Sequence, residues 1–228
     1  MAMRLIIGNK NYSSWSLRPW VAMTVAGIAF SETLLPLDTP DFRTRVSSLG
    51  GDQGRGSVPV LIDGDVVVWE SLAILEYLAD KFPQAGLWPA HAGARAHARA
   101  VAAEMHAGFQ PLRRHLPMNI RRPVKPRVLD DAVAVDVARI DRIWSECRAR
   151  FGGSEGAFLH GQFGAADAMY APVVWRFHTY AVRVSDVARA YMNAVLALPA
   201  SVAWRDAARA EPWVLAHDEV DWPDVLRE

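Results

Sequence analysis

Cysteine is nearly absent from this chain, which carries Cys147 as its only one among 228 residues. A single cysteine excludes an internal disulfide and any metal site built from several cysteines, and it favours a reducing compartment. Long hydrophobic runs are absent too. No stretch reaches the ~18 apolar residues of a membrane span, and the apolar run at residues 5–7 is too short for a secretory signal. We therefore expect a soluble cytoplasmic protein that makes no contact with a membrane.

The chain also lacks a net charge, because 25 lysines and arginines balance 25 aspartates and glutamates. Without an overall field, no nucleic-acid partner is expected. One segment is nevertheless unbalanced, since residues 105–129 carry six basic side chains and no acidic one. This basic segment, which includes Arg113 and Arg121, is either a solvated loop or a surface that attracts an anionic substrate such as a dicarboxylate.

The seven histidines give no recognisable metal signature. His97, His106 and His115 are spaced by nine residues, which places successive members on alternating helix faces, so we predict no metal site. Cys147 shares an apolar helical segment with Ile143, which is typical of a packed core residue rather than a reactive thiol.

The two ends of the chain differ in their patterns. Hydrophobic residues make up 51% of the sequence, which is enough for a sizeable core. Over residues 1–82, short β-like runs alternate with helical periodicity, whereas alanine and arginine dominate after residue 92 and the β signal disappears. We therefore predict a mixed α/β domain over residues 1–82 and an all-helical domain over residues 93–228.

Within these domains the hydrophobic periodicity and turn residues predict individual elements. Asp63 and Gly64 form a two-residue hairpin signal between β-branched runs, and Pro83 stops the helix that follows. A loop rich in glycine and serine precedes the hairpin. The predicted strands cover residues 3–7, 32–37, 57–62 and 65–70, and the predicted helices cover residues 16–28, 71–82, 94–116, 128–151, 165–184, 185–198 and 201–210.

Three segments, in this order, resemble the cytosolic glutathione transferases: "SVPVL" (57–61), "WESLAILEYL" (69–78) and "FGAADAMYAPVV" (163–174). The resemblance implies a thioredoxin-like N-terminal domain followed by an all-helical domain, glutathione as co-substrate without a metal, and a homodimer. It also implies a capping box at the third segment, where Gly164 replaces the usual Ser or Thr. Asp167 is then expected to support the helix start and not to act in catalysis.

The resemblance assigns the glutathione-binding residues. Pro59 is expected to be cis, which leaves the backbone of Val58 to pair with glutathione as an added strand. Ser71 opens a helix, where its hydroxyl and amide would hold the γ-glutamyl carboxylate, with Glu70 facing the ammonium group. Arg55 is a weaker candidate for the glycyl carboxylate. The glycine-rich residues 49–57 lack the Gly-Lys-Ser/Thr ending of a phosphate-binding loop.

Three serines in the stretch "NYSSWSLRPW" compete for the thiol of glutathione. Lowering a thiol pKa from ~8.5 by ~2 units needs roughly 2.7 kcal/mol, which a hydroxyl donor and helix N-terminal amides can supply. Because proline is tolerated only in a first turn, Pro19 favours a helix start near Ser16, which would make Ser16 the N-cap. Ser13 and Ser14 then remain in the turn, and the resemblance favours Ser13 over Ser14 as the catalytic donor.

Tyr12 is a rival hydroxyl donor next to Ser13. Trp15 stands where the zeta class has a cysteine, so disulfide exchange through an enzyme thiol is excluded. Tyr12, Trp15, Arg113 and Arg121 are expected to line a pocket for a hydrophobic or anionic electrophile. The predicted function is a glutathione transferase, with a zeta-like maleylacetoacetate-type isomerase and a non-catalytic glutathione-binding protein as alternatives.

Overall fold

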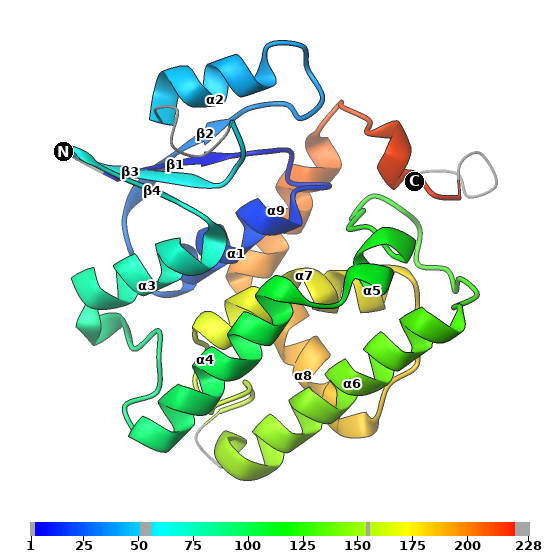
Figure 1. Cartoon of the computed structure of the whole chain (residues 1–228). Coiled ribbons are helices and arrows are strands. Elements are labelled where there is room, and N and C mark those ends of the chain that lie inside the picture. The colour runs from blue at the N-terminus through cyan, green and yellow to red at the C-terminus, as the bar shows by residue number, and fades with distance from the viewer. Residues whose placement is uncertain (1–2, 51–55, 154–155, 222–228) are drawn as a thin grey trace.

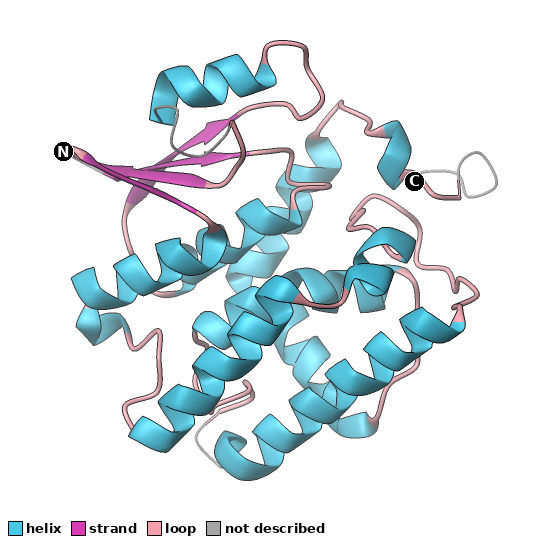
Figure 2. Ribbon diagram, in the orientation of Figure 1, coloured by secondary structure: helices cyan, strands magenta, loops and turns pink. Residues whose placement is uncertain are grey.

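A computed structural model describes residues 3–50, 56–153 and 156–221 of the chain (Figure 1). Its strands gather at one end of the molecule and helices fill the rest (Figure 2). The predicted fold class, a small α/β region followed by an all-helical one, is confirmed. The first region comprises β1 (Met3–Ile7), α1 (Ser14–Val25), β2 (Phe30–Leu34), α2 (Phe42–Gly50), β3 (Val60–Asp63), β4 (Val66–Trp69) and α3 (Ser71–Lys81).

The sheet is mixed, with the strand order β2-β1-β3-β4. β1 runs parallel to β2, with Met3 opposite Phe30, and antiparallel to β3. Alternate side chains of β1 enter different cores: Leu5 packs in the cluster shared with α1 and α3, whereas Ile6 packs with Val46 of α2. β1 is therefore buried on both faces, with α2 on one side of the sheet and α1 and α3 on the other (Figure 1).

Three details of the α/β region differ from the predictions. α2 was expected to be part of a loop, because it buries only Val46 and Gly50 and so shows little helical periodicity. β2 lies two residues earlier than predicted, where it pairs with β1. The hairpin turn lies at Gly64 and Asp65, since Asp63 pairs with Val66 across the ladder, and Gly64 has a φ of +60°.

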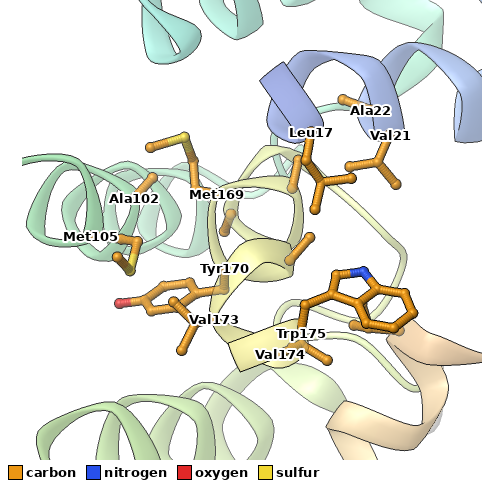
Figure 3. Packing of buried hydrophobic residues seen from close by; sticks show 14 of the residues in the cluster. Leu17, Val21, Ala22, Ala102, Met105, Met169, Tyr170, Val173, Val174 and Trp175 are labelled. Atoms are coloured by element: carbon orange, nitrogen blue, oxygen red, sulfur yellow. The ribbon is translucent and has the colours of Figure 1, made fainter. Parts of the chain in front are cut away.

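The helical region surrounds α7, in which every residue except His178 is buried. α1 of the first region and α4 both pack on α7, so Leu17, Val21, Met105 and Met169 share one apolar core (Figure 3). Burial of this kind makes the two regions a continuous structure. The elements after α3 are η2 (Pro83–Ala85), α4 (Ala92–Ala107), α5 (Gln110–His115), α6 (Asp131–Cys147), η3 (Arg148–Gly152), α7 (Ala165–Thr179), α8 (Asp186–Leu196), α9 (Pro199–Ala210) and η4 (Ala216–Asp218).

The helix predicted over residues 94–116 is two helices, α4 and α5. The chain breaks between them at Gly108 and Phe109, and Phe109 adopts a left-handed φ of +61°. At the start of α7, Asp167 accepts a hydrogen bond from the N–H of Gly164 (2.9 Å), as the half capping box predicts, and a second from the N–H of Leu159 (3.0 Å), which was not predicted. In the part of the chain that the structure describes, no helix is both long and apolar enough to cross a membrane.

Candidate functional site

The turn between β1 and α1 places the three serines differently from the prediction. α1 begins at Ser14 with Ser13 as its N-cap, so the prediction that Ser16 caps the helix is wrong. Ser16 is buried, and its hydroxyl oxygen accepts hydrogen bonds from the N–H of Gly8 (3.1 Å) and the hydroxyl of Ser13 (2.7 Å). Pro19 therefore lies inside the helix, where it lacks the N–H that would donate to the carbonyl four residues earlier.

A cavity of about 580 Å³ opens against this turn. Its wall combines the β1–α1 turn with the segment before β3, with α5 and α7, and with the chain that follows α9. Six of the predicted site residues are brought together there, and three predicted glutathione-binding residues, Pro59, Glu70 and Ser71, lie outside its lining. The six are Tyr12, Ser13, Ser14, Trp15, Val58 and Arg113.

The predicted glutathione-binding segment before β3 is present. The Val58–Pro59 peptide bond is cis, as the resemblance implied. Pro59 is buried just outside the β3 ladder, and Val58 is half-buried at the cavity wall. Within residues 3–50, 56–153 and 156–221, no backbone hydrogen bond engages Val58. Arg55, the candidate for the glycyl carboxylate, lies outside the described residues.

Glu70 and Ser71 lie at the start of α3, as predicted, where Glu70 has an unusual backbone conformation and Ser71 is buried. Glu70 has a φ of +68°, which is rare for a residue with a side chain and is typical of strained functional positions. Its carboxylate is 60% exposed and lies 3.7 Å from the His106 Nε2. Ser71 is fully buried, and its hydroxyl accepts a hydrogen bond from the Arg18 Nη1 at 3.3 Å. Arg18 therefore connects the start of α3 to α1.

Trp15 lies beneath two guanidinium groups. Those of Arg18 and Arg113 are 4.1 Å and 4.9 Å from the centre of its ring, and His106 meets the ring edge-on at 5.4 Å. Cation–π contacts of this kind hold the tryptophan and both arginines in place. Through Trp15, the Ser13–Ser14 turn is connected to Glu70 by His106 and to Ser71 by Arg18.

Arg18 and Arg176 are the important residues that the sequence analysis missed. Arg176 comes from α7, where its Nε donates to the carbonyl of Leu116 (2.8 Å) and its Nη2 to the hydroxyl of Ser14 (3.4 Å). The Nη1 of Arg176 and the Nε and Nη2 of Arg18 are buried without a hydrogen-bond partner among the described residues. The only available signal was a charged residue inside an otherwise apolar helical pattern.

The electrostatics at this end of the cavity favour a bound anion. Burial lowers the pKa of Arg176 to about 10, and nearby Arg113 adds to the effect. Burial also lowers the pKa of Arg18, followed by repulsion from Arg113 and Arg176. Burial raises the pKa of Asp218 on the cavity wall, and its carboxyl group lies 3.7 Å from His217. Two buried arginines and the half-buried Arg113, which repel one another, would be stabilised by a negatively charged ligand.

Tyr12 and Arg121 interact with the end of the chain. The Tyr12 hydroxyl donates to Glu219 at 2.5 Å and accepts from the Arg121 Nη2 at 3.1 Å. Burial and the Glu219 carboxylate raise the pKa of Tyr12, and its one hydroxyl proton is already donated to Glu219, which disfavours it as a donor to a thiolate. Arg121 does not line the cavity, because its guanidinium binds the carbonyls of Glu211 and Trp213. Its predicted place in the electrophile pocket is not supported.

Two further arginines of the basic segment, Arg122 and Arg127, are neutralised by an aspartate. Arg122 is buried, forms an ion pair with Asp221, and donates to the carbonyls of Lys125 (2.9 Å) and Thr179 (3.0 Å). Arg127 lies 3.6 Å from the same aspartate. Arg122 and Arg127 therefore fit neither the solvated loop nor the anion-attracting surface considered from sequence, whereas Arg114 and Lys125 are exposed and Arg113 lines the cavity.

Known protein families and individual proteins match this chain in sequence. The family models "Glutathione S-transferase, N-terminal domain" and "Glutathione S-transferase, C-terminal domain" match residues 12–81 and 130–213. Glutathione S-transferase Z2 of Arabidopsis thaliana is 28% identical over 204 residues, which cover 80% of this chain and 84% of the relative. A probable maleylacetoacetate isomerase of Caenorhabditis elegans is 30% identical over 100 residues, 44% of this chain and 45% of the relative.

Solved structures agree with the family models on the fold. A glutathione transferase homolog from a Burkholderia (BGR1), crystallised with bound glutathione, superposes with a TM-score of 0.65 at 21% identity, over 92% of this chain and 100% of that one. The two family models together cover more than half of the chain, one on each region of the fold. The protein belongs to the glutathione S-transferase family.

Proposed function

We propose that this protein is an enzyme that binds glutathione and activates its thiol for attack on an electrophilic carbon. The observation that carries the proposal is the position of Ser13 and Ser14 at the N-terminus of α1, on the wall of a cavity that also contains the buried guanidinium of Arg176. Hydroxyl donors, helix amides and an incompletely paired cation all stabilise a thiolate over a thiol.

The peptide part of glutathione would pair with the backbone of Val58, whose N–H and C=O are free of other backbone partners in the described chain. The γ-glutamyl end would reach the start of α3. There the Ser71 hydroxyl already accepts from Arg18, so a carboxylate at this position gains an arginine as well as a helix N-terminus. The exposed Glu70 carboxylate supplies a partner for the ammonium group.

Ser13 is our proposed donor to the sulfur. Its hydroxyl donates to Ser16 in the structure, and giving up that bond costs about 1 kcal/mol. A hydrogen bond to a charged group contributes ~1.5 to 3 kcal/mol, so the exchange is favourable once the thiolate is present. Ser14 accepts from Arg176 and so keeps that guanidinium beside the sulfur. In this arrangement Ser13 contacts the thiolate and Ser14 positions the charge.

A second candidate reaction is isomerisation of a maleyl-type double bond. It would proceed by addition of the thiolate to one carbon, rotation about the resulting single bond, and elimination of the same thiolate. Arg113 and Arg176 on the cavity wall suit a substrate that carries carboxylates, and two of the relatives are a glutathione S-transferase Z2 and a probable maleylacetoacetate isomerase. The family resemblance further suggests a homodimer, which analytical ultracentrifugation would test.

Turnover in serine variants tests the proposal. Ser13→Ala should lower kcat/KM for a conjugated electrophile or a maleyl substrate by roughly 10- to 100-fold, equivalent to ~1.4 to 2.7 kcal/mol. Ser14→Ala should have a smaller effect. Ser48→Ala, which removes an exposed hydroxyl on α2, is the matched control. Retention on immobilised glutathione without turnover of any electrophile would instead identify a non-catalytic binding protein.

A further inference from the structure

Three potential metal ligands from separate parts of the helical region meet away from the proposed glutathione site. His97 lies on α4, Cys147 is the last residue of α6, and His160 lies in the loop before α7. One ligand atom from each residue falls within 4.8 Å of the other two. None of the three residues lines the cavity that contains Ser13. The glutathione-dependent reaction proposed above makes no use of them.

The distances within this cluster are close to those of a metal-bound set. The His97 Nδ1 lies 3.2 Å from the His160 Nε2 and 4.0 Å from the Cys147 Sγ. Tetrahedral Zn²⁺, with Zn–N of about 2.0 Å and Zn–S of about 2.3 Å, sets its nitrogen ligands roughly 3.3 Å apart and a nitrogen–sulfur pair roughly 3.6 Å apart. The third pair, Cys147 and His160, lies within 4.8 Å, so closing around an ion would require the thiol and imidazole side chains to move by up to about 1 Å.

The loop that carries His160 is held firmly against the end of α6. The Arg148 guanidinium donates to the carbonyls of Gly156 (2.8 Å) and Phe158, and the N–H of Leu159 donates to the buried Asp167. Directly after Cys147 the backbone changes to a short π-helix, η3, a rare conformation that is frequent at functional sites. A cluster built on fixed elements is pre-organised for an ion.

Phe151, on this π-helix, packs against both imidazoles, with ring centres 4.8 Å from His97 and 5.2 Å from His160. Phe151 and His160 also line a second cavity of about 1110 Å³, through which water and an ion can reach the cluster. Cys147 itself is fully buried, and both histidines are half-buried. A buried thiol and two half-buried imidazoles beside an open cavity fit a site that takes an ion from solution.

We propose that His97, Cys147 and His160 bind a Zn²⁺ ion. Two neutral imidazoles and one thiolate match the borderline-soft character of zinc, and water would complete four-coordination. On binding, the S–H bond of Cys147 breaks, its proton passes to solvent, and a Zn–S bond forms without a change of oxidation state. The ion would join α4, α6 and the loop before α7, and so stabilise the helical region.

This site has no recognisable sequence motif, because its ligands are 50 and 13 residues apart in the chain and lie on different elements. We predicted no metal site from the histidine spacing along one helix, and that reasoning did not consider ligands on separate segments. The alternative explanation of the cluster is a hydrogen bond between two neutral histidines beside a packed thiol. A bound cobalt ion distinguishes the two explanations, because only a metal site that includes the Cys147 thiolate produces a thiolate-to-cobalt absorption band.

Cobalt titration tests the proposal on the full-length chain, purified without a polyhistidine tag and stripped with a chelator. Because Cys147 is the only cysteine in the protein, any thiolate-to-cobalt charge-transfer band must come from this site. One equivalent of Co²⁺ should produce that band together with the strong visible absorption of a tetrahedral site, and Zn²⁺ should abolish both. Zinc at ~100 times its Kd should also raise the Tm by roughly 5 to 10 °C.

His97→Gln and His160→Gln should each weaken cobalt binding at least tenfold. His178→Gln, which removes a half-buried histidine of α7 outside the cluster, should leave binding unchanged. Cys147→Ser should abolish the thiolate-to-cobalt band. If that variant fails to fold, the presence or absence of the band in the unaltered chain still tests the proposed site. The absence of a thiolate band at saturating cobalt, or a band of equal strength in both cluster variants, would overturn the proposal.

Discussion

Two groups of buried charge in this protein differ in how completely they are paired. Arg122, at one edge of the helical region, binds an aspartate and several carbonyl groups. Arg18 and Arg176, beside the serine turn, retain buried guanidinium nitrogens with no partner in the described chain. Burying an unpaired donor costs about 1 to 3 kcal/mol, so the second group is retained at an energetic disadvantage.

The difference indicates which arginines belong to the structure and which to the function. A buried cation with a full set of partners stabilises the fold, and removing it leaves those partners unsatisfied. A buried cation with free donors next to a cavity is a place where a ligand supplies the missing partner. The first group coincides with the basic segment of the sequence, whereas the second is assembled from α1 and α7.

Replacing Arg122 should have the largest effect on stability. Arg122→Met leaves Asp221 and the carbonyls of Lys125 and Thr179 without their donor, so the free energy of unfolding should fall by roughly 3 to 5 kcal/mol. Denaturant unfolding followed by circular dichroism would measure this loss. The ratio of KM values for an anionic and a neutral substrate should stay unchanged. A selective rise in KM for the anionic substrate would contradict the structural role that we assign to Arg122.

Asp167 is a buried carboxyl group that, like Arg122, has hydrogen-bond partners, and it makes the free energy of unfolding depend on pH. Burial raises its pKa from 3.8 to about 6, so the folded chain holds this proton more tightly than the unfolded chain. Its contribution to stability is therefore greatest below about pH 4 and is lost as the pH rises through about 6, by up to ~3 kcal/mol. Urea unfolding between pH 4 and 7 should show this decline in the native chain and not in Asp167→Asn. Parallel curves for the two proteins would argue against it.

Arg176→Met tests the incompletely paired group and should have the smallest effect on stability. Removing a buried, half-satisfied cation should change the free energy of unfolding by no more than about 1 kcal/mol, because the desolvation penalty disappears with the lost hydrogen bonds. The pKa of bound glutathione should rise by roughly one unit, or ~1.4 kcal/mol. A large loss of stability with an unchanged thiol pKa would show that Arg176, like Arg122, serves the fold and not the site.

The sequence allowed the fold to be predicted further than the site. β1 occupies the predicted residues because its apolar run is short and bounded, and the order of three family-like segments established both regions. α2 escaped prediction because only Val46 and Gly50 of its residues are buried, which leaves little helical periodicity in the sequence. Pro19 gave a wrong helix start, since the proline is accommodated inside α1 at the loss of one backbone hydrogen bond.

The charges around the site depend on contacts that a single sequence does not reveal. Arg121 and Arg122 stand in an uninterrupted basic segment, yet the groups that neutralise them come from the chain after α9, about 90 to 99 residues away. Arg18 and Arg176 are separated by most of the chain, and the packing of α1 on α7 brings both close to the serine turn, where Arg176 lines the cavity and Arg18 is buried behind Trp15. Local patterns therefore predicted the serines, and tertiary packing determined the arginines.

The pKa of glutathione bound to the unaltered protein tests the central claim most directly. Thiolate absorbance in the ultraviolet would be followed against pH, with free glutathione in the same buffer as reference. If the serine turn and the arginines stabilise the thiolate, the pKa of the bound thiol should lie about 2 units below the ~8.5 of a free thiol, a difference of roughly 2.7 kcal/mol. Saturating binding with a thiol pKa equal to that of free glutathione would contradict the account.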